Sequence, residues 1–172
     1  MRKARVQRGE RVLIDGASGA VGTYAVQLAR HLGATVTAVC GPSNQTLVRS
    51  LGAAHVLDYT REDFAQLLGR CDVIFDAVGK LPAPHWKQAL EPVGRYLSVH
   101  AASGSRERAE DLRSLAELIE AGVLRPVIDR CYPLEEIVEA HRYVDTGRKK
   151  GNMAILVAGP EEERYSACRA RS

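Results

Sequence analysis

Short apolar runs, rich in valine and isoleucine, alternate along this chain with segments of helical periodicity. Five runs are expected to form strands: Val12 to Asp15, Thr35 to Val39, His55 to Asp58, Cys71 to Ala77 and Arg95 to Val99. Polar residues do not alternate with apolar ones inside most of these runs, which is typical of a parallel sheet covered on both faces.

Helical segments separate the predicted strands. The first has an apolar stripe that includes Val21, Ala25 and Leu28, and Gly33 follows it as a stop signal. Further helices are expected at about 44–51, from Thr60, at 84–90 and at 108–121, the last burying Leu112, Leu115, Ala116 and Ile119. Strands that alternate with helices predict an α/β fold with a doubly wound parallel sheet of about five strands.

The last third of the chain has a different character. A helix is expected from Pro133 to Asp145 and a strand from Met153 to Val157. A polar tail follows that has little to bury, so we expect it to be disordered. The predicted organisation is an α/β domain over 1–130, a helix and strand over 131–158, and a disordered tail over 159–172.

Composition and charge narrow the classes of function. The chain has 172 residues, of which 45% are hydrophobic, enough for one sizeable core. Its 24 basic and 21 acidic residues give a net charge of +3, and they are interspersed, which argues against a nucleic-acid partner. No apolar stretch is long enough for a membrane span, which predicts a cytoplasmic protein without a membrane partner.

The cysteines are widely spaced along the chain. They are Cys40, Cys71, Cys131 and Cys168, and no two of them form a C-x-x-C pair. This spacing suits neither a disulfide framework nor a zinc knuckle, so we expect reduced thiols and no metal site.

The strongest chemical signal is the run GASGAVG at 16–22, between the first predicted strand and the first predicted helix. Ala17, Gly19 and Gly22 occupy the positions of a G-x-G-x-x-G dinucleotide fingerprint, with Ala in the first place. A helix N-terminus can bind a pyrophosphate because its first N–H groups lack intrahelical partners. An ordinary turn explains an isolated G-x-x-G equally well, but the strand–loop–helix context favours a cofactor site. The predicted pyrophosphate contacts are Ala17, Ser18, Gly19, Ala20, Val21 and Gly22.

The residues after the second predicted strand bear on the choice of cofactor. An acid about twenty residues beyond the glycines would bind the ribose 2′-hydroxyl of NAD, but no carboxylate occurs between Val39 and Asp58. This absence favours NADP(H) over NAD(H). Ser43 and Asn44 could contact a 2′-phosphate, although helix capping is the commoner role of such residues.

Two other nucleotide-dependent classes fit less well. Methyltransferases that use S-adenosylmethionine resemble this layout, but they usually place an acid at the end of the second strand, where Cys40 stands. Short-chain dehydrogenases need a Tyr-x-x-x-Lys pair, and none of the six tyrosines has a lysine four residues later.

Three longer runs carry a resemblance to a known family: ERVLIDGASGAVGTYAVQLARHLGATVTAVCG, LVRSLGAAHVLDYT and CDVIFDAVG. They are similar to the Rossmann-type cofactor domain of the medium-chain dehydrogenase/reductase superfamily, in particular its quinone oxidoreductase-like branch, often called zinc-binding dehydrogenases. The run LRPVIDRCYPLEEIVEAHRYVDTGRKKGNMAILV resembles the C-terminal end of the same proteins. The resemblance implies that 1–130 is a dinucleotide-binding domain and that the helix and strand over 131–158 are left from the catalytic domain.

The resemblance implies hydride transfer between NADPH and a quinone, enone, carbonyl compound or alcohol. It places Ser43 and Tyr59 near the adenosine ribose phosphate, Ala77 and Val78 near the nicotinamide ribose, and His100 and Ala101 near the ring. Tyr59 would serve equally as a rim aromatic at the sheet edge, and His100 as an exposed loop residue. No residue is assigned as a catalytic acid or base.

The chain also departs from the family pattern. Members begin with a GroES-like catalytic domain, whereas only fifteen residues precede Gly16, so that domain is expected to be absent. The short join at 101–106 replaces a helix and a sixth strand through which many members dimerise. The strand at 153–157 would lack its usual partner, so we expect it to dock on the remaining sheet or to drive self-association.

These observations support two hypotheses about the function of the chain. In the first, the chain binds NADP(H) and has weak hydride-transfer activity alone, because half of the substrate site is not encoded. In the second, it is a non-catalytic nucleotide-binding or interaction module, or an inactive remnant. A separate chain could also supply the missing domain.

Overall fold

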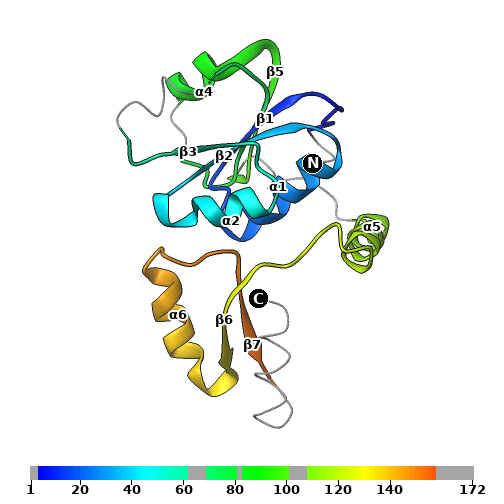
Figure 1. Ribbon diagram of the computed structural model, residues 1–172. Helices are drawn as coiled ribbons and strands as arrows, with labels where there is room; N and C mark the ends of the chain where they lie inside the picture. Colours follow the sequence, from blue (N-terminus) through cyan, green and yellow to red (C-terminus); the bar gives the residue numbers. More distant parts are fainter. Residues whose placement is uncertain (1–3, 62–68, 81–82, 101–107, 158–172) are drawn as a thin grey trace. The chain divides into compact units, whose positions relative to one another are not determined.

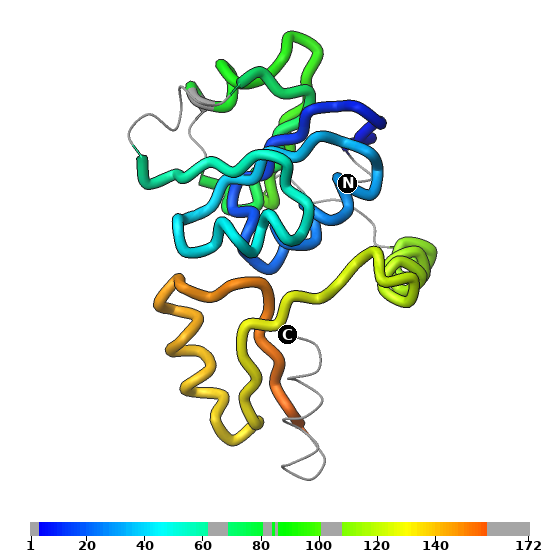
Figure 2. The backbone as a smooth tube through the Cα atoms, viewed as in Figure 1, coloured from blue at the N-terminus to red at the C-terminus, as the bar shows by residue number. Residues whose placement is uncertain are grey.

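The computed structural model describes residues 4–61, 69–80, 83–100 and 108–157. Contacts within the chain divide it into two compact units, 1–125 and 126–172. Figures 1 and 2 show both units, and each is described below by itself.

The first unit is built on a five-stranded parallel sheet. Its strands are β1 (Arg11–Asp15), β2 (Thr35–Cys40), β3 (His55–Asp58), β4 (Cys71–Asp76) and β5 (Leu90–Ser98). Their order is β3-β2-β1-β4-β5, and all four pairings are parallel. The predicted doubly wound α/β fold is confirmed. The strand order reverses direction between β1 and β4, and ligands of such sheets bind beyond the carboxyl ends of the strands at that point.

Helices connect these strands. They are α1 (Ala20–His31), a 3₁₀ turn at Pro42–Asn44 that continues into α2 (Gln45–Ser50), α4 (Ala83–Ala89) and α5 (Ala109–Glu120). In Figure 1, α1 and α2 lie on one side of the sheet and α4 lies on the other. The predicted helix that starts near Thr60 falls mostly within 62–68, outside the described residues.

The core of this unit lies around the two central strands. Val12, Leu13 and Ile14 of β1 are fully buried, as are Val73 and Ile74 of β4. Such unbroken burial matches the apolar runs in the sequence, because helices cover both faces of a central parallel strand. On the face that α1 covers, the helix contributes Ala25, Val26 and Ala29.

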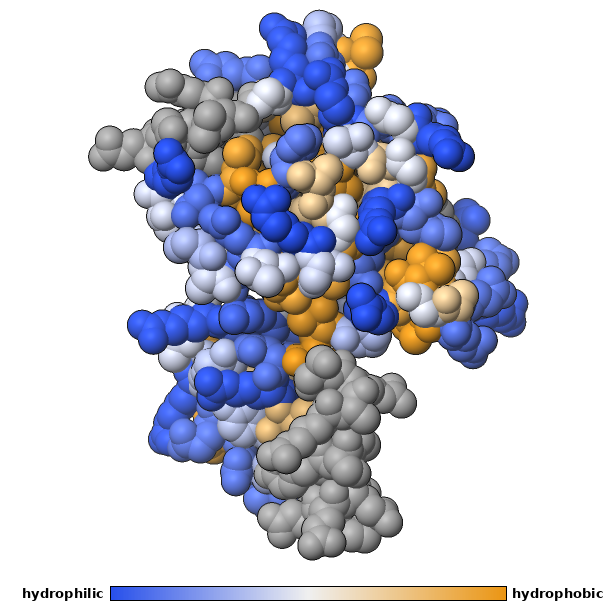
Figure 3. Space-filling model, viewed as in Figure 1, coloured by the Kyte–Doolittle hydropathy of each residue, from blue (hydrophilic) through white to orange (hydrophobic). Residues whose placement is uncertain are grey.

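Two details of the first unit differ from expectation. β5 begins at Leu90 rather than Arg95, because Leu90 already pairs with Cys71 before the β4–β5 register shifts. The helix α5 forms where predicted, but none of its residues is buried, and Leu112 is 66% exposed. Figure 3 shows apolar surface over this helix. Periodicity predicts an apolar helix face, but it does not determine what covers that face.

The second unit contains a two-stranded parallel sheet and one helix. Its elements are β6 (Ile128–Pro133), a 3₁₀ turn at Leu134–Glu136, α6 (Ile137–Asp145) and β7 (Asn152–Leu156). The side chain of Asp129 accepts hydrogen bonds from the Tyr143 hydroxyl at 2.6 Å and from the Lys150 amide at 3.1 Å. These bonds join β6 to α6 and to the segment that leads into β7.

Three expectations for this part change. The sequence did not predict β6, and the predicted helix begins at Ile137 rather than at Pro133. β7 pairs with β6, so the expectation that it docks on the five-stranded sheet is wrong. Its self-association stays a prediction. Contacts divide the chain after Arg125, and the predicted domain boundary at 130 stays a prediction. The predicted disordered tail lies outside the described residues.

The cysteines are not all alike. Cys40 and Cys71 are free and buried, whereas Cys131 is disulfide-bonded. The expectation of reduced thiols is therefore wrong for Cys131, because spacing along a sequence does not limit which cysteines a fold brings together.

Among the helices that the structure describes, none is long and apolar enough to cross a bilayer.

Candidate functional site

The turn between β1 and α1 is shaped by backbone bonds and by one left-handed glycine. Gly16 has φ +70°, the Ala17 amide donates to the Val39 carbonyl at 3.0 Å, and the Gly19 amide donates to the Gly16 carbonyl at 3.0 Å. Since the left-handed residue is Gly16, Ala17 fits the first fingerprint position, where its side chain is fully buried. The departure from the G-x-G-x-x-G pattern does not distort the turn.

The two glycines of this fingerprint have different surroundings. A Cβ at Gly22 would overlap the Gly16 carbonyl oxygen and lie 2.7 Å from the Ala17 Cα, and neither backbone atom can move aside cheaply. A Cβ at Gly19 would meet only the Gly16 oxygen, at 3.4 Å. Gly22 therefore permits the close approach of helix to strand, while the space at Gly19 is open to a ligand.

The N-terminus of α1 is suited to an anion. Its N-cap residue Gly19 has an extended backbone and makes no side-chain cap bond, and the first turn carries no acidic residue. The amides of Ala20, Val21 and Gly22 therefore start a helix whose positive end lies at the carboxyl edge of β1.

Residues predicted on the adenosine side come together here. The Asn44 side-chain amide donates to the Ser18 hydroxyl at 3.1 Å, which joins the loop after β1 to the loop after β2. Ser43 contacts Asn44 at 3.5 Å between side-chain oxygens. The Tyr59 hydroxyl lies 3.4 Å from the position of a Cβ at Gly41, and 59% of the residue is exposed. Four predicted contacts thus cluster at the ends of β1, β2 and β3.

A carboxylate also lies close to this cluster. Asp58 at the end of β3 is in register with Cys40 at the end of β2. Hydrogen bonds from the Thr60 hydroxyl at 2.7 Å and the Thr60 amide at 2.9 Å lower the pKa of Asp58. Burial, and then the charge of Asp58, raise the pKa of the Cys40 thiol, while Arg49 lowers it. Sequence reasoning missed Asp58 and Arg49 here, because the register that brings them near Cys40 is set by the fold.

The loop after β4 is held by a buried acid. Asp76 is fully buried, and its carboxylate accepts hydrogen bonds from the Val78 amide at 3.0 Å, the Gly79 amide at 2.6 Å and the Tyr96 hydroxyl at 2.9 Å. These bonds fix the backbone at Val78, and the Ala77 amide donates to the Asp15 carbonyl at 3.0 Å. The predicted residues Ala77 and Val78 therefore sit beside the glycine loop. A Cβ at Gly16 would lie 2.5 Å from the Val78 side chain.

His100 lies against the same loop. Its ring covers Gly79, where an added Cβ would come within 3.1 Å of the ring Cγ, and its amide is bonded to the Ser98 hydroxyl at 3.3 Å. The expectation for Ala101 lies outside the described residues. Sequence reasoning also missed Asp76 and Tyr96. A lone acid at the end of an apolar strand, followed by Ala-Val-Gly, was the available signal for Asp76.

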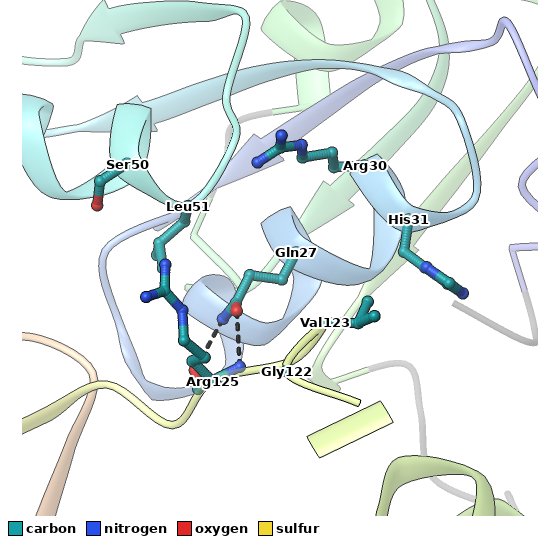
Figure 4. Close-up of a pocket in the computed structure, with 8 residues that line it drawn as sticks. All are labelled: Gln27, Arg30, His31, Ser50, Leu51, Gly122, Val123 and Arg125. Carbon is teal, nitrogen blue, oxygen red and sulfur yellow. Dashed lines mark hydrogen bonds between the residues drawn. The ribbon is translucent and has the colours of Figure 1, made fainter. Parts of the chain in front are cut away.

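A separate pocket of about 390 Å³ lies at the other end of α1 (Figure 4). Its polar lining includes Arg30, His31 and Arg125. The Gln27 side chain joins α1 to the segment around Arg125, because it donates to the Arg125 carbonyl at 3.0 Å and accepts from the Arg125 amide at 2.8 Å. None of the predicted cofactor residues lines this pocket. Arg30 and His31 stand in the last turn of α1, where positive side chains favourably oppose the helix dipole.

Comparisons with known proteins agree with this geometry. A family model described as zinc-binding dehydrogenase matches residues 20–123, and a second model with the same description matches 99–155. The chain belongs to the zinc-binding dehydrogenase family. This membership confirms the resemblance inferred from the glycine-rich run and its neighbours.

Proteins that are similar in sequence to this chain are reductases or oxidoreductases by name. The chain is 32% identical over 169 residues to a 2-methylene-furan-3-one reductase of Solanum lycopersicum, covering 90% of this chain and 42% of that protein. It is 33% identical over 192 residues to the mitochondrial NAD(P)H oxidoreductase RTN4IP1 of Mus musculus, covering 87% and 48%. The chain thus spans about half the length of these relatives.

The solved structure of a similar protein supports the fold. The quinone oxidoreductase from Coxiella burnetii superimposes with a TM-score of 0.82 at 27% identity, over 91% of this chain and 56% of that one.

The family's description raises the question of a metal. Among the residues that the structure describes, no three His, Cys, Asp or Glu side chains gather where they could hold a metal ion. The described residues therefore do not fit a zinc centre.

Proposed function

We propose that the five-stranded unit binds a nicotinamide dinucleotide, NADP(H) in preference to NAD(H). The whole protein then transfers hydride between this cofactor and a quinone, enone, carbonyl compound or alcohol. The observation that carries the proposal is the N-terminus of α1, which has Gly19 as its N-cap and no side-chain cap, at the point where the strand order reverses. The NAD(P)H oxidoreductases among the relatives support a nicotinamide cofactor.

Each part of the cofactor has a proposed place. The pyrophosphate meets the residues of the glycine loop, Ala17, Ser18, Gly19, Ala20, Val21 and Gly22. The ribose phosphate of the adenosine lies near Ser43, Asn44 and Tyr59. The nicotinamide ribose lies along Ala77 and Val78, with the ring near His100 and Ala101. The pair Ser18–Asn44 supports this arrangement because it joins the first two regions by a 3.1 Å hydrogen bond.

The preference for NADP(H) rests on charge at the end of β2. That strand ends in Cys40, which is neutral because burial raises its thiol pKa, and Arg49 is close enough to act on it. A cation and a neutral residue favour a 2′-phosphate, whereas Asp58 on the neighbouring strand opposes it. Asp58 stays ionised, because the two Thr60 bonds lower its pKa, but these bonds also occupy a carboxylate oxygen that a ribose 2′-hydroxyl of NAD(H) would need. We therefore expect the cation and the neutral residue to decide the preference.

Thermal denaturation with and without nucleotide tests this proposal. A ligand that binds only the native state raises the melting midpoint. We expect a larger rise with NADPH than with NADH. Equal rises would overturn the NADP(H) preference, and no rise with either nucleotide at millimolar concentration would overturn the binding site itself.

The second candidate function is that of a non-catalytic nucleotide-binding or interaction module. One feature of the described residues supports it: the carboxyl edge of the sheet carries loops suited to a cofactor, and we assign no catalytic acid or base among them. A thermal shift without turnover of quinones or enones would favour the module. Turnover that appears only with a second chain would show that a partner contributes to the site.

Further proposals concern the cellular compartment, the binding partners and the oligomeric state of the protein. We propose a cytoplasmic protein that uses no zinc and binds neither nucleic acid nor membrane, and that self-associates through β7. Light scattering tests the last point: a monodisperse monomer with fast amide exchange from Met153 to Leu156 would count against it. Fractionation of cells tests the compartment, for which the mitochondrial relative is a reason to look beyond the cytosol.

A further inference from the structure

Two carboxyl groups stand side by side at the carboxyl edge of the sheet. Asp15 is the last residue of β1 and Asp76 is the last residue of β4, and the two are register partners. Asp76 is fully buried and Asp15 is partly buried. Two adjacent carboxylates in a buried site do not ionise together readily, because each charge disfavours the other.

The hydrogen-bond partners show which member holds a proton. Asp76 accepts from two backbone amides and from the Tyr96 hydroxyl, and all three bonds stabilise its anion. Asp15 has one backbone bond, from Gly16, and a side-chain bond with Asp76. The Asp15 carboxyl is therefore the donor and the Asp76 carboxylate the acceptor. Burial, and then the charge of Asp76, raise the pKa of Asp15 to about 6.

The same two residues hold the loops of the proposed cofactor site. Asp15 leads directly into Gly16, whose Cα packs against the Val78 side chain. Asp76 fixes the backbone of Val78 and Gly79. The contact between the two carboxyls thus links the strand that leads into the glycine loop to the residue that fixes the loop after β4.

We propose that Asp15 and Asp76 share one proton and act as positioning residues, which hold the two loops together while the proton is present and loosen them when it leaves. The proposal rests on the proposed nucleotide site. Nucleotide affinity then falls as Asp15 ionises, because the pair repels and because a new negative charge adjoins the residues that meet the pyrophosphate. By linkage, nucleotide binding near neutral pH takes up a proton.

Other groups near the pair do not reverse this effect. On β5, Tyr96 stays protonated because burial and its bond to Asp76 raise its pKa to about 12. On β2, the register partner of Asp15 is Val39, whose side chain is neutral. The first turn of α1 carries no acidic residue, and Asp76 is the only side chain among those described whose charge clearly shifts the pKa of Asp15.

The test is the pH dependence of NADP⁺ binding by calorimetry, at pH 5.5 and 7.5, in the wild type and in Asp15→Asn. If binding raises the pKa of Asp15 from about 6 to about 7, affinity in the wild type falls about sixfold between these pH values through this group alone. Asn donates to Asp76 without titrating, so the variant lacks that part of the fall. Titration of the 2′-phosphate is common to both proteins and cancels in the comparison.

Two further variants complete the test. Glu117→Gln on the exposed face of α5 removes the same charge elsewhere and should keep the wild-type dependence. Tyr96→Phe removes a donor to the Asp76 anion, so the transition should move to higher pH. An identical fall in wild type and Asp15→Asn would overturn the shared-proton proposal while leaving the cofactor site intact. An absence of NADP⁺ binding in every protein at both pH values would overturn the cofactor site itself.

Discussion

A methyl group added at Gly22 or at Gly19 should separate the structural role of the glycine loop from its binding role. At Gly22, the Cβ would overlap the Gly16 carbonyl oxygen and lie 2.7 and 2.8 Å from the Ala17 Cα and carbonyl carbon. All three are backbone atoms, so the helix must move away from the strand. Overpacking costs about 1–3 kcal/mol, and overlap with three backbone atoms places Gly22→Ala in the upper part of that range. A net destabilisation of about 1–2 kcal/mol is left after the gain of about 1 kcal/mol expected for Ala over Gly in a helix.

The matched variant Gly19→Ala should behave in the opposite way. Gly19 has φ −79° and ψ 178°, which alanine adopts without strain, and the nearest atom to its Cβ is 3.4 Å away. We expect a stability loss of no more than about 1 kcal/mol, since Ala at an N-cap costs about 1 kcal/mol relative to the best capping residues and Gly already costs a few tenths. The methyl group would occupy the space through which a pyrophosphate approaches, so NADPH affinity should fall at least about tenfold, or about 1.4 kcal/mol.

Differential scanning calorimetry without ligand and isothermal titration with NADPH measure the two effects. Gly22→Ala should lower the melting midpoint by roughly 2–8 °C, at about 2–4 °C per kcal/mol for a chain of this size. Gly19→Ala should melt near the wild type but bind poorly. Full NADPH affinity in Gly19→Ala would refute the placement of the pyrophosphate, and an unchanged midpoint in Gly22→Ala would refute the packing argument.

Three further outcomes are expected. First, the folded pKa of Asp15, about 6, exceeds its unfolded value, so its contribution to stability is complete below about pH 4 and is lost as pH rises to about 6. This loss is at most about 3 kcal/mol, and denaturant titrations should show it in the wild type but not in Asp15→Asn. Second, Tyr96→Phe leaves the buried Asp76 carboxylate short of one donor and should destabilise the protein by about 1–2 kcal/mol, and an unchanged denaturation midpoint would contradict the bond. Third, Gln27→Leu removes both bonds to the Arg125 backbone, so the Arg125 amide should exchange with solvent at least about tenfold faster, whereas unchanged protection would show that Leu124 alone holds the segment.

The sequence predicted the five-stranded sheet well because its strands are short, apolar and separated by clear helix signals. All five predicted strands exist, and the run at 16–22 forms the expected strand–loop–helix turn. These features depend on local periodicity and on turn chemistry. Both can be found without knowledge of long-range contacts.

Features that depend on long-range contacts were missed. β6 has the sequence IDRCYP, in which charged residues and a proline hide a strand whose pairing partner starts at Asn152. The apolar stripe of α5 predicted burial, but coverage is decided by other parts of the fold. The importance of Asp76 comes from Tyr96, twenty residues later, and from its register partner Asp15. No spacing rule connects these three residues.

The most direct test of the central claim, that the carboxyl edge of the sheet holds a nicotinamide dinucleotide, is an amide NMR titration of the ¹⁵N-labelled chain with NADPH. We expect saturable shifts of Gly19, Gly22 and Gly79, and little change at Gly147 in the second unit. Shifts confined to the basic pocket around Gly122 and Arg125, or no shifts at millimolar NADPH, would contradict the claim.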